Sequence, residues 1–591
     1  MHLYEPPVND FQFIIHKLLK VHNLNLKGYS DLSPDFTKTI FEEAGKLAKE
    51  ELAPLNISGD REGCTLENGV VRTPKGFKEA FLKVNSGGWT GIDCDPEFGG
   101  QGMPHVISLV IGEMFCSANM ALNMYHGLTH GAYSAIYKHG NKEQKNTYLP
   151  NLVNCKWTGT MNLTEPHCGT DLGLIKTKAQ KNHDGSYQIT GQKIFISAGD
   201  HDLSENIIHL VLARIPGSPE GVKGISMFIV PKFLINEDGA IGERNKLSVG
   251  KIEEKMGIHG NSTCVMNYDG AKGFLISEEN KGLRAMFTMM NEARLGVGLQ
   301  GIGQAEAAYQ RAAAYAKERL QGKDISKKDI SKNADPIIQH PDIRRTLMDQ
   351  KVFIEAARAL ALWCATMLDF AEREGDKESE GLASLLIPVV KGFITDKGFE
   401  STINSQQVFG GHGYIEEWGM SQFARDARIA MIYEGTNGIQ ALDLVGRKLS
   451  SDGGKHTVRF LKEIKDFISQ NKEDDRISEN FITPLNNALK DAETCLEFFM
   501  KEGLNNPNQA LAGATDFMHL TGYLALGFMW ARMVKVALDE LALSNKEDAL
   551  LNAKVSSGRY FFRRHLPETS LRKERVLNGA DDMMELRVED F

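Results

Sequence analysis

A single carboxylate, Glu434, stands among apolar and small residues in the turn Ile432-Tyr-Glu-Gly-Thr-Asn-Gly438, just after Ala430-Met431. Apolar surroundings disfavour the charged form of a carboxyl group, so they raise its pKa and suit it to act as a general base. The alternative is an ordinary solvated glutamate in a turn, and the local sequence taken alone favours that interpretation.

Two further glycine-bearing turns have the composition of ligand-binding loops. In the stretch 161–171, Pro166 fixes one dihedral, Gly169 frees another, and Thr164 and Thr170 supply hydroxyls among exposed amides. The second turn, Gln407-Val-Phe-Gly-Gly-His-Gly-Tyr414, has three glycines in four positions. So little side-chain cover suits close contact with a large ligand or with another subunit.

Three other patterns suggest chemistry but have plainer explanations. The sequence Gly296-Val-Gly-Leu-Gln-Gly301 satisfies a dinucleotide motif, but a helical pattern already precedes it, so we interpret its glycines as helix-packing residues. His126 and His130 could share a helix face, but they lack a metalloprotease carboxylate and an identifiable third ligand, which favours polar or core roles. The basic stretch 554–575 is expected to be a solvated or interface face, with an anionic ligand or a membrane surface as the alternative.

The composition is that of a globular chain with several domains. The chain has 591 residues, 42% of them apolar and 25% charged, which excludes a largely disordered protein. Its formal charge of −9 argues against a protein whose main role is to bind nucleic acid. No two of the eight cysteines form a CxxC pair, so we expect neither a disulfide scaffold nor a metal site. A polar N-terminus and the lack of an 18-residue apolar run predict a cytoplasmic protein, with 520–536 as a buried amphipathic helix.

The elements that must position these turns follow an α, β, α, α order. Helical periodicity runs from about residue 33 to 156, with helices expected at 106–124 and 141–153. Short β-rich runs follow at 187–190, 194–197, 207–215 and 225–230. Long helices of a bundle are expected at 283–320, 341–374, 380–407 and 425–449. After a linker at 450–454, further helices are expected at 458–470, 482–500, 508–541 and 547–562. The absence of βαβ alternation disfavours a doubly wound nucleotide fold.

Taken jointly, the turns and this order of elements resemble the acyl-CoA dehydrogenase family. The motifs that carry the resemblance are Asp95-Pro-Glu-Phe-Gly-Gly-Gln-Gly102, Leu163-Thr-Glu-Pro166, Gly169-Thr-Asp171, Gly191-Gln-Lys-Ile-Phe-Ile-Ser197, Glu318-Arg319, Gln407-Val-Phe-Gly-Gly411, Arg425-Asp426 and Ile432-Tyr-Glu-Gly-Thr436. The opening Tyr4-Glu-Pro-Pro-Val-Asn-Asp10 and the lobe after residue 450 are similar to an enlarged bacterial subgroup. That subgroup includes 3-methylmercaptopropionyl-CoA dehydrogenases and broad-range fatty acyl-CoA dehydrogenases.

The resemblance implies a mainly α fold with a central β module. Its expected parts are an N-terminal extension (1–34), an N-terminal helical domain (35–158), a β domain (159–280), a C-terminal four-helix bundle (281–450) and an additional C-terminal helical domain (451–591). It also implies that FAD lies between the β domain and the bundle, where a partner subunit covers part of it.

Most of the expected site residues come only from this resemblance. Those expected to bind FAD are Met161, Leu163, Thr164, Gly169, Thr170, Phe195, Ile196, Ser197, Arg319, Gln407, Gly410, Gly411, Thr436 and Asn437. Those expected to contact the substrate are Thr170, Asn291, Arg294, Tyr433 and Gly435.

The resemblance makes Glu434 the catalytic base. It would remove the α-proton of an acyl-CoA thioester while a hydride leaves the β-carbon for N5 of FAD. The Glu434 backbone amide and a ribityl hydroxyl of FAD would polarise the thioester. Some relatives carry their base immediately before the arginine that Arg294 matches, but Ala293 occupies that position here, so Glu434 remains.

The chain departs from the family pattern at several positions. Pro166-His-Cys-Gly169 stands where many relatives have Pro-Gly-Ala-Gly, and Asn291 replaces the usual aspartate. Gly322 stands where an aromatic residue is common, and a polar segment, 322–337, looks inserted. The contacts with flavin, diphosphate and adenine at these positions are therefore open.

The leading functional hypothesis is an acyl-CoA dehydrogenase that is a homodimer and passes electrons to an electron-transferring flavoprotein. The alternatives are a methylthio-acyl-CoA dehydrogenase and an acyl-CoA oxidase, although the terminal Val588-Glu-Asp-Phe591 lacks the peroxisomal address common in oxidases. An intact Glu434 argues against a non-enzymatic relative. A peripheral membrane contact through residues 451–591 is a further expectation.

Overall fold

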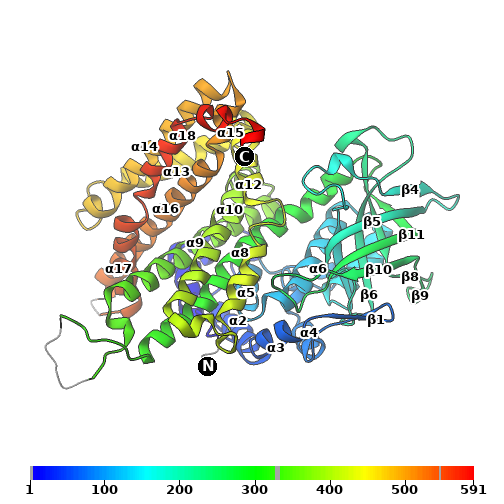
Figure 1. Ribbon diagram of the computed structural model, residues 1–591, viewed down its shortest axis with the longest axis horizontal. Helices are drawn as coiled ribbons and strands as arrows, with labels where there is room; N and C mark the ends of the chain where they lie inside the picture. Colours follow the sequence, from blue (N-terminus) through cyan, green and yellow to red (C-terminus); the bar gives the residue numbers. More distant parts are fainter. Residues whose placement is uncertain (1–3, 327–332, 545–546) are drawn as a thin grey trace. The chain divides into compact units, whose positions relative to one another are not determined.

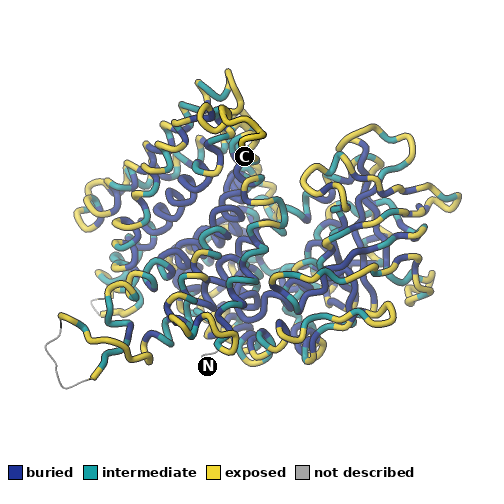
Figure 2. Tube along the Cα trace, viewed as in Figure 1, coloured by how far each residue is buried: buried dark blue, intermediate teal, exposed yellow. Residues whose placement is uncertain are grey.

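The computed structural model describes residues 4–326, 333–544 and 547–591, and these fold into two compact units (Figure 1). One unit comprises residues 43–296, and the other joins residues 4–42 to residues 297–591. Within each unit the buried residues follow the strands and the inward faces of the helices, while exposed residues follow the turns (Figure 2).

The unit of residues 43–296 is built around a seven-stranded sheet. Its strands are β3 (Trp157–Asn162), β4 (Lys178–Lys181), β5 (Tyr187–Ser197), β6 (Asn206–Arg214), β7 (Ile225–Pro231), β10 (Leu247–Ile252) and β11 (Thr263–Ile276). Because β7 pairs with both β6 and β11, the strands β11, β5, β4, β6 and β7 form a closed ring. The runs expected at 187–190 and 194–197 form one strand, β5. Two small hairpins pair β1 (Thr65–Glu67) with β2 (Val70–Arg72) and β8 (Phe233–Ile235) with β9 (Ile241–Arg244).

The rest of this unit is mainly helical. Its helices are α3 (Pro54–Glu62), α4 (Phe77–Ser86), α5 (His105–Ala118), α6 (Met120–His139) and α7 (Lys142–Val153), after α2 (Pro34–Leu47). Of these, α6 and α7 contact strand β3. The single helix expected at 106–124 is wrong, because Asn119 adopts an extended conformation and its side chain caps α6 by accepting from Leu122 N at 3.1 Å. Helix α6 lies directly on β3, where a Cβ on Gly159 would come within 2.3 Å of Ala132 Cβ.

Long helices form the bundle. These are α8 (Gly282–Glu318), α9 (Pro341–Glu374) and α10 (Lys377–Val408), which confirm three of the expected helices, followed by α11 (Met420–Ile429) and α12 (Asn437–Asp443). The continuous helix expected at 425–449 is wrong, because the chain leaves helical geometry at 430–436. The glycines of the dinucleotide motif lie inside α8, and a Cβ on Gly298 would come within 2.6 Å of Val390 Cγ1 in α10. The helix-packing interpretation is confirmed for Gly298 and for Gly301, where a Cβ would come within 3.0 Å of Thr395 Cα, whereas a Cβ on Gly296 would meet nothing within 4 Å.

Residues 451–591 form a helical region that we call the C-terminal lobe. Its main helices are α13 (Lys455–Asn471), α14 (Thr483–Phe498), α15 (Pro507–Ala512), α16 (Ala514–Ser544), α17 (Ala549–Arg564) and α18 (Glu568–Leu577). The helix expected at 508–541 is divided at Gly513, which lies against Val576 of α18. Helix α16 is almost wholly buried from Ala514 to Val534, which confirms that 520–536 is a buried helix, although it is buried on nearly every face and not on one alone. Among the described helices, none combines the length and the hydropathy that spanning a bilayer requires.

The N-terminal extension is bound to the bundle and the C-terminal lobe by buried charges. Asp10, in α1 (Val8–Gln12), accepts from Arg358 of α9 and from Lys554 of α17, and both cations are 1% exposed. Arg358 also donates to Glu306 at 2.7 Å, and Lys554 to Glu355 at 2.7 Å. The expectation of a solvated or interface face at 554–575 is therefore wrong for Lys554, which serves the interior.

Candidate active site

The turn that carries Glu434 lies between α11 and α12 and has an unusual backbone. Glu434 (φ 58) and Gly435 (φ 82) are both left-handed, a conformation that glycine adopts freely but glutamate rarely does. Thr436 then caps α12 by accepting from Ile439 N at 3.3 Å. Strained residues of this kind persist only where surrounding contacts fix them, and such residues cluster at functional sites.

The contacts that fix the 430–436 loop come from buried side chains of the same unit. Lys391 of α10, which is fully buried, donates from Nζ to Gly435 O at 2.7 Å. Gln440 donates from Nε2 to Glu434 O at 2.9 Å, and Asn437 N donates to Met431 O at 3.0 Å. The backbone on both sides of the Glu434 carboxylate is therefore held.

Tyr433 and Asn437, two further predicted site residues, take different positions in this loop. The Tyr433 hydroxyl donates to Gln300 of α8. The Asn437 side chain is buried and turned into the bundle, where it accepts from Lys391 Nζ at 2.8 Å and donates to Asp396 Oδ1 at 2.7 Å. A contact between Asn437 and a cofactor would therefore use its backbone, whereas the Thr436 side chain is exposed.

In the other unit, the loop 163–171 follows β3 and is anchored by a buried ion pair. Glu165, 3% exposed, accepts from Lys193 Nζ at 2.8 Å and from Lys176 N at 2.7 Å and Thr177 N at 3.0 Å. Burial alone would raise the pKa of Glu165, but the Lys193 charge and these hydrogen bonds hold it below its usual value. Lys193 also donates to Leu163 O at 2.9 Å, so one cation fixes two residues at the start of the loop.

Around this loop, several predicted cofactor residues present unused groups. Within the part of the chain that the structure describes, the hydroxyls of Thr164, Thr170 and Ser197 make no side-chain hydrogen bond. Phe195 is left-handed (φ 59) and its ring is 61% exposed. An exposed, flat aromatic ring beside spare hydroxyls matches what a planar heterocycle with polar edges requires. Ile196 points into the core and is 2% exposed, so only its backbone could contact a ligand; Met161 and Leu163 are half-buried.

The remaining predicted cofactor residues are solvent-facing in the single chain. Arg319, Gln407, Gly410 and Gly411 are all exposed. Gly410 is left-handed (φ 57), and a Cβ on either glycine would meet nothing within 4 Å. Among the described residues, no carboxylate pairs with the Arg319 guanidinium, which leaves it available to an anion.

An aromatic group supports the glycine turn at 410–413. Tyr315 of α8 stacks on Phe409, with ring centroids 4.2 Å apart, and its hydroxyl lies 2.8 Å from His412 Nδ1. His412 stacks in turn on Trp418 at 4.6 Å. These side chains support the turn, in which Gly413 is buried while Gly410 and Gly411 stay uncovered.

The two predicted substrate residues of α8 differ in burial. Asn291 is exposed, and Arg294, three residues further along the helix, is 6% exposed. Three residues correspond to most of a turn, so both lie on neighbouring parts of one helix face.

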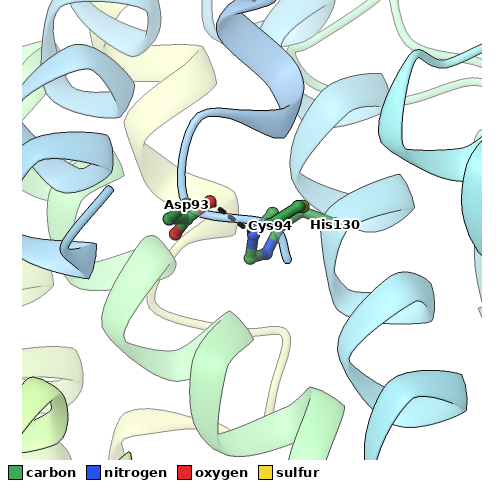
Figure 3. Close-up of side chains that lie close together, drawn as sticks. All are labelled: Asp93, Cys94 and His130. Carbon is green, nitrogen blue, oxygen red and sulfur yellow. Dashed lines mark hydrogen bonds and ion pairs between the residues drawn. The ribbon is translucent and has the colours of Figure 1, made fainter. Parts of the chain in front are cut away.

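A cluster that the sequence did not reveal surrounds His130 (Figure 3). Its Nε2 lies 2.8 Å from Asp93 Oδ1, and its Nδ1 contacts Glu292 of α8. The other oxygen of Asp93 bonds His105 Nδ1 at 2.9 Å and accepts from Ser108 at 2.6 Å. These carboxylates are 37 and 162 residues from His130 in the chain, so only the folded chain brings them to it.

The charge state of this cluster follows from its partners. Burial alone would lower the pKa of His130, but Asp93 and Glu292 raise it well above its usual value, so the ring is an imidazolium. Asp93, Cys94 and His130 offer ligand atoms within 4.8 Å of one another, a grouping that could hold a metal ion. Both ring nitrogens already contact carboxylates, so ion pairing alone accounts for the arrangement.

His126, by contrast, has the core role expected for it: it stacks on Phe81, and burial lowers its pKa to about 3.

The comparison with known families covers nearly the whole chain. Residues 35–156 match "Acyl-CoA dehydrogenase, N-terminal domain", 160–271 match the middle domain, and 280–449 match the C-terminal domain. Residues 460–587 match "Acetyl-CoA dehydrogenase C-terminal like". The chain therefore belongs to the acyl-CoA dehydrogenase family, and it is an oxidoreductase with the family's three domains and an additional C-terminal domain.

Two curated relatives are similar to this chain over nearly its whole length. It is 40% identical to the 3-methylmercaptopropionyl-CoA dehydrogenase of Ruegeria pomeroyi over 98% of this chain and 99% of that protein. It is 32% identical to the broad-specificity linear acyl-CoA dehydrogenase FadE5 of Mycobacterium tuberculosis over 99% of each chain. The fold is similar to that of Caenorhabditis elegans ACDH-11, solved in complex with C11-CoA, with a TM-score of 0.81 and 18% identity over 99% of this chain and 95% of that one.

Proposed function

We propose that this enzyme uses FAD to remove hydrogen from the α- and β-carbons of an acyl-CoA thioester, giving the trans-2-enoyl-CoA, with Glu434 as the base. The observation that supports this assignment best is the backbone of Glu434, a left-handed glutamate on a loop held by Lys391 and Gln440. Family membership supplies the reaction class.

The chain's own groups have three tasks in this reaction. The Glu434 carboxylate takes the α-proton, and the two electrons of that C–H bond become the new C=C bond as a hydride leaves the β-carbon. The Glu434 backbone amide donates to the thioester carbonyl oxygen and so acidifies the α-carbon. Lys391 and Gln440 hold the backbone that carries both groups, which spares the enzyme the reorganisation of a mobile loop.

FAD fits the groups that the structure leaves unused. In the described part of the chain, Thr164, Thr170 and Ser197 have spare hydroxyls, Phe195 is exposed, and Arg319 has a guanidinium without a carboxylate partner for the diphosphate. Bound FAD supplies the acceptor, at N5, for the hydride from the β-carbon. The further contacts that we assign to FAD are those of Met161, Leu163, Gly169, Ile196, Gln407, Gly410, Gly411, Thr436 and Asn437.

The assignments for substrate and partners extend this proposal. Thr170, Asn291, Arg294, Tyr433 and Gly435 contact the acyl-CoA, and a cytoplasmic homodimer passes its electrons to an electron-transferring flavoprotein in a β-oxidation pathway. The proposal also includes a peripheral membrane contact through the C-terminal lobe.

A methylthio-acyl-CoA is the second candidate substrate. The 40% identity to a 3-methylmercaptopropionyl-CoA dehydrogenase over nearly all of both chains favours it, while the 32% identity to a broad-specificity linear acyl-CoA dehydrogenase favours straight chains.

Flavin absorbance under anaerobic conditions tests both the reaction and the substrate. The purified FAD-loaded enzyme is mixed with propionyl-, butyryl-, octanoyl- and 3-methylthiopropionyl-CoA, and the flavin band is followed. Bleaching by a thioester supports the proposal, and the fastest bleaching identifies the preferred chain. An unbleached flavin with every thioester would refute the proposal, and rapid peroxide formation in air would assign an oxidase.

A further inference from the structure

The C-terminal lobe contacts the bundle closely at one crossing of helices. Helix α16 of the lobe crosses α10 of the bundle, and each helix contributes a glycine. A Cβ on Gly392 would lie 2.4 Å from Met518 Sδ, and a Cβ on Gly522 would lie 2.3 Å from the Phe393 ring. Because neither glycine has a side chain, the two backbones approach closely, and residue 519 of α16 faces α10.

Because the two helices lie so close, His519 of α16 reaches an aspartate of α10. Its Nε2 lies 2.9 Å from Asp396 Oδ2, and the histidine is only 8% exposed. The Phe393 ring meets His519 edge-on at 5.3 Å between centroids and packs against Tyr523 at 5.0 Å. Aromatic packing therefore limits the positions that the imidazole can take.

Asp396 also bonds Asn437, the residue that follows the 430–436 loop. Its other oxygen, Oδ1, accepts from Asn437 Nδ2 at 2.7 Å. The same amide nitrogen lies 3.0 Å from Gly392 O and 2.9 Å from Thr395 Oγ1. The first residue of α12 is therefore tied to α10 by a carboxylate that the lobe holds from its other side.

Asn437 completes the connection through Lys391. Asn437 Oδ1 accepts from Lys391 Nζ at 2.8 Å, and the same nitrogen donates to Gly435 O at 2.7 Å. A continuous series of hydrogen bonds, none longer than 2.9 Å, thus runs from His519 through Asp396, Asn437 and Lys391 to the residue after Glu434.

The residues that form this series of hydrogen bonds are buried or half-buried. Lys391 is completely buried, and Asn437 is only 8% exposed. In a buried site, a hydrogen-bond network is rigid when every polar group has a partner. Loss of one partner leaves a buried polar group unpaired, which destabilises the folded protein. A left-handed glutamate persists only while its neighbours over-determine its backbone, and the network supplies that restraint.

We propose that the C-terminal lobe acts in catalysis through His519, a positioning residue that holds the Glu434 loop by way of Asp396, Asn437 and Lys391. The inference rests on the proposed role of Glu434 as the base. The lobe thereby does more than add buried surface, because His519 bonds the α10 aspartate that holds Asn437, next to the Lys391 contact with Gly435.

A second histidine of the lobe provides a matched control. His565 Nε2 lies 3.0 Å from Asp349 Oδ1 of α9, so it also links the lobe to a bundle aspartate. Asp349 bonds Tyr560 and Arg345, and these contacts lie on α17 and α9. Removing either histidine deletes one buried or half-buried contact between the lobe and the bundle, but only His519 leads to Asn437.

The test compares His519→Leu, His519→Gln and His565→Leu in the FAD-loaded full-length enzyme. Anaerobic stopped-flow reduction by the thioester that bleaches the wild type best gives the limiting rate and the half-saturating concentration. We expect His519→Leu to lower the limiting rate roughly 10- to 100-fold, with the half-saturating concentration changed less than about twofold. His519→Gln, whose amide can donate to Asp396, should recover most of the rate, and His565→Leu should keep it.

Amide hydrogen exchange provides a measurement that does not depend on activity. His519→Leu should speed exchange in residues 430–437, whereas His565→Leu should leave it unchanged there. If the leucine variant does not fold, His519→Asn serves instead, because it is polar but too short to reach Asp396.

Each outcome decides the inference. Wild-type rates and exchange in His519→Leu would overturn it, and so would an equal loss in His565→Leu, which would mean general destabilisation. If the wild type is not reduced by any thioester, or if Glu434→Gln is reduced normally, the proposed function fails, and this inference fails with it; a slow His519→Leu beside an inactive Glu434→Gln supports both.

Discussion

The Nζ of Lys391 lies 2.7 Å from the carbonyl oxygen of Gly435, the residue that follows Glu434. The lysine comes from the middle of α10 and is completely buried, so its Nζ donates to Gly435 O and Asn437 Oδ1 and not to water. One long helix of the bundle thereby sets the backbone of a turn some forty residues later in the chain. This contact explains why the apolar run before Glu434 leaves helical geometry.

Replacing Lys391 with methionine should therefore impair both stability and rate. The change removes the closer of two donors from Gly435 O and from Asn437 Oδ1, which keep only Gln440 and Thr395 at 3.3 Å, and each weakened acceptor costs up to about 1–3 kcal/mol. We expect a lower melting temperature and a limiting reduction rate at least about tenfold below that of the wild type. Lys397→Met, further along α10 at a partly exposed ion pair with Glu400, is the control and should keep the rate. A Lys391→Met enzyme with wild-type reduction would show that the loop does not need this contact.

Replacing Glu434 with glutamine should separate chemistry from binding. The amide has the shape of the carboxylate but cannot accept the α-proton, so flavin reduction should slow by about 10²–10⁴-fold. The bound FAD per chain and the melting temperature should stay close to those of the wild type. Stopped-flow reduction and the flavin-to-protein absorbance ratio measure the two properties, and rapid reduction of this variant would assign the base to another residue.

The sequence predicts this fold where local patterns decide it. The helices α8, α9 and α10 follow their apolar periodicity, and the β-rich runs fall on strands. The three helix breaks that were missed depend on contacts that periodicity does not contain. At Gly513 the chain lies against Val576 of α18. At Asn119 a side-chain cap starts a new helix, and at 430–436 an apolar run continues the helical pattern until Lys391 and Gln440 draw the backbone out of it.

In the candidate site too, the sequence predicts the local motifs but not the long-range contacts. The Glu434 turn and the loop at 163–171 are local motifs, and the sequence alone marks them. The contacts that hold these motifs are not local, because Asp396 and His519 are 123 residues apart, and Glu165 and Lys193 are 28 residues apart. A motif reveals which groups meet a ligand, while the residues that fix those groups become visible only when the chain is folded.

Replacing Asp10 with asparagine should destabilise the protein in a pH-dependent way. Burial alone would raise the pKa of Asp10, but the charges of Lys554 and Arg358 lower it to about 2 from an ordinary value of 3.8. Removing the carboxylate leaves two buried cations without their shared partner, which costs on the order of 3–5 kcal/mol. We expect a clear drop in melting temperature at neutral pH.

The sign of the pH effect follows from the lowered pKa of Asp10. The stabilisation is complete above about pH 4, where the carboxyl is ionised in both the folded and the unfolded chain, and it is lost as the pH falls towards 2. The difference in melting temperature between the wild type and Asp10→Asn should therefore shrink on acidification. A difference that stays constant from pH 6 to about pH 3 would contradict this account of the N-terminal extension.

The His130 cluster should show the opposite dependence, and its own helix provides the control. The pKa of His130 is raised well above the ordinary value of 6.5 by Asp93 and Glu292, so its stabilisation is complete below that value and is lost as the pH rises through the folded-state pKa. The pKa of His126, one turn earlier in α6, is lowered by burial to about 3, so above 6.5 it is neutral in both states and contributes no pH dependence there. Between about pH 6.5 and 9, the melting-temperature deficit of His130→Gln relative to the wild type should therefore shrink, while that of His126→Gln stays constant. Parallel curves for the two variants would show that His130 carries no charge in the folded enzyme.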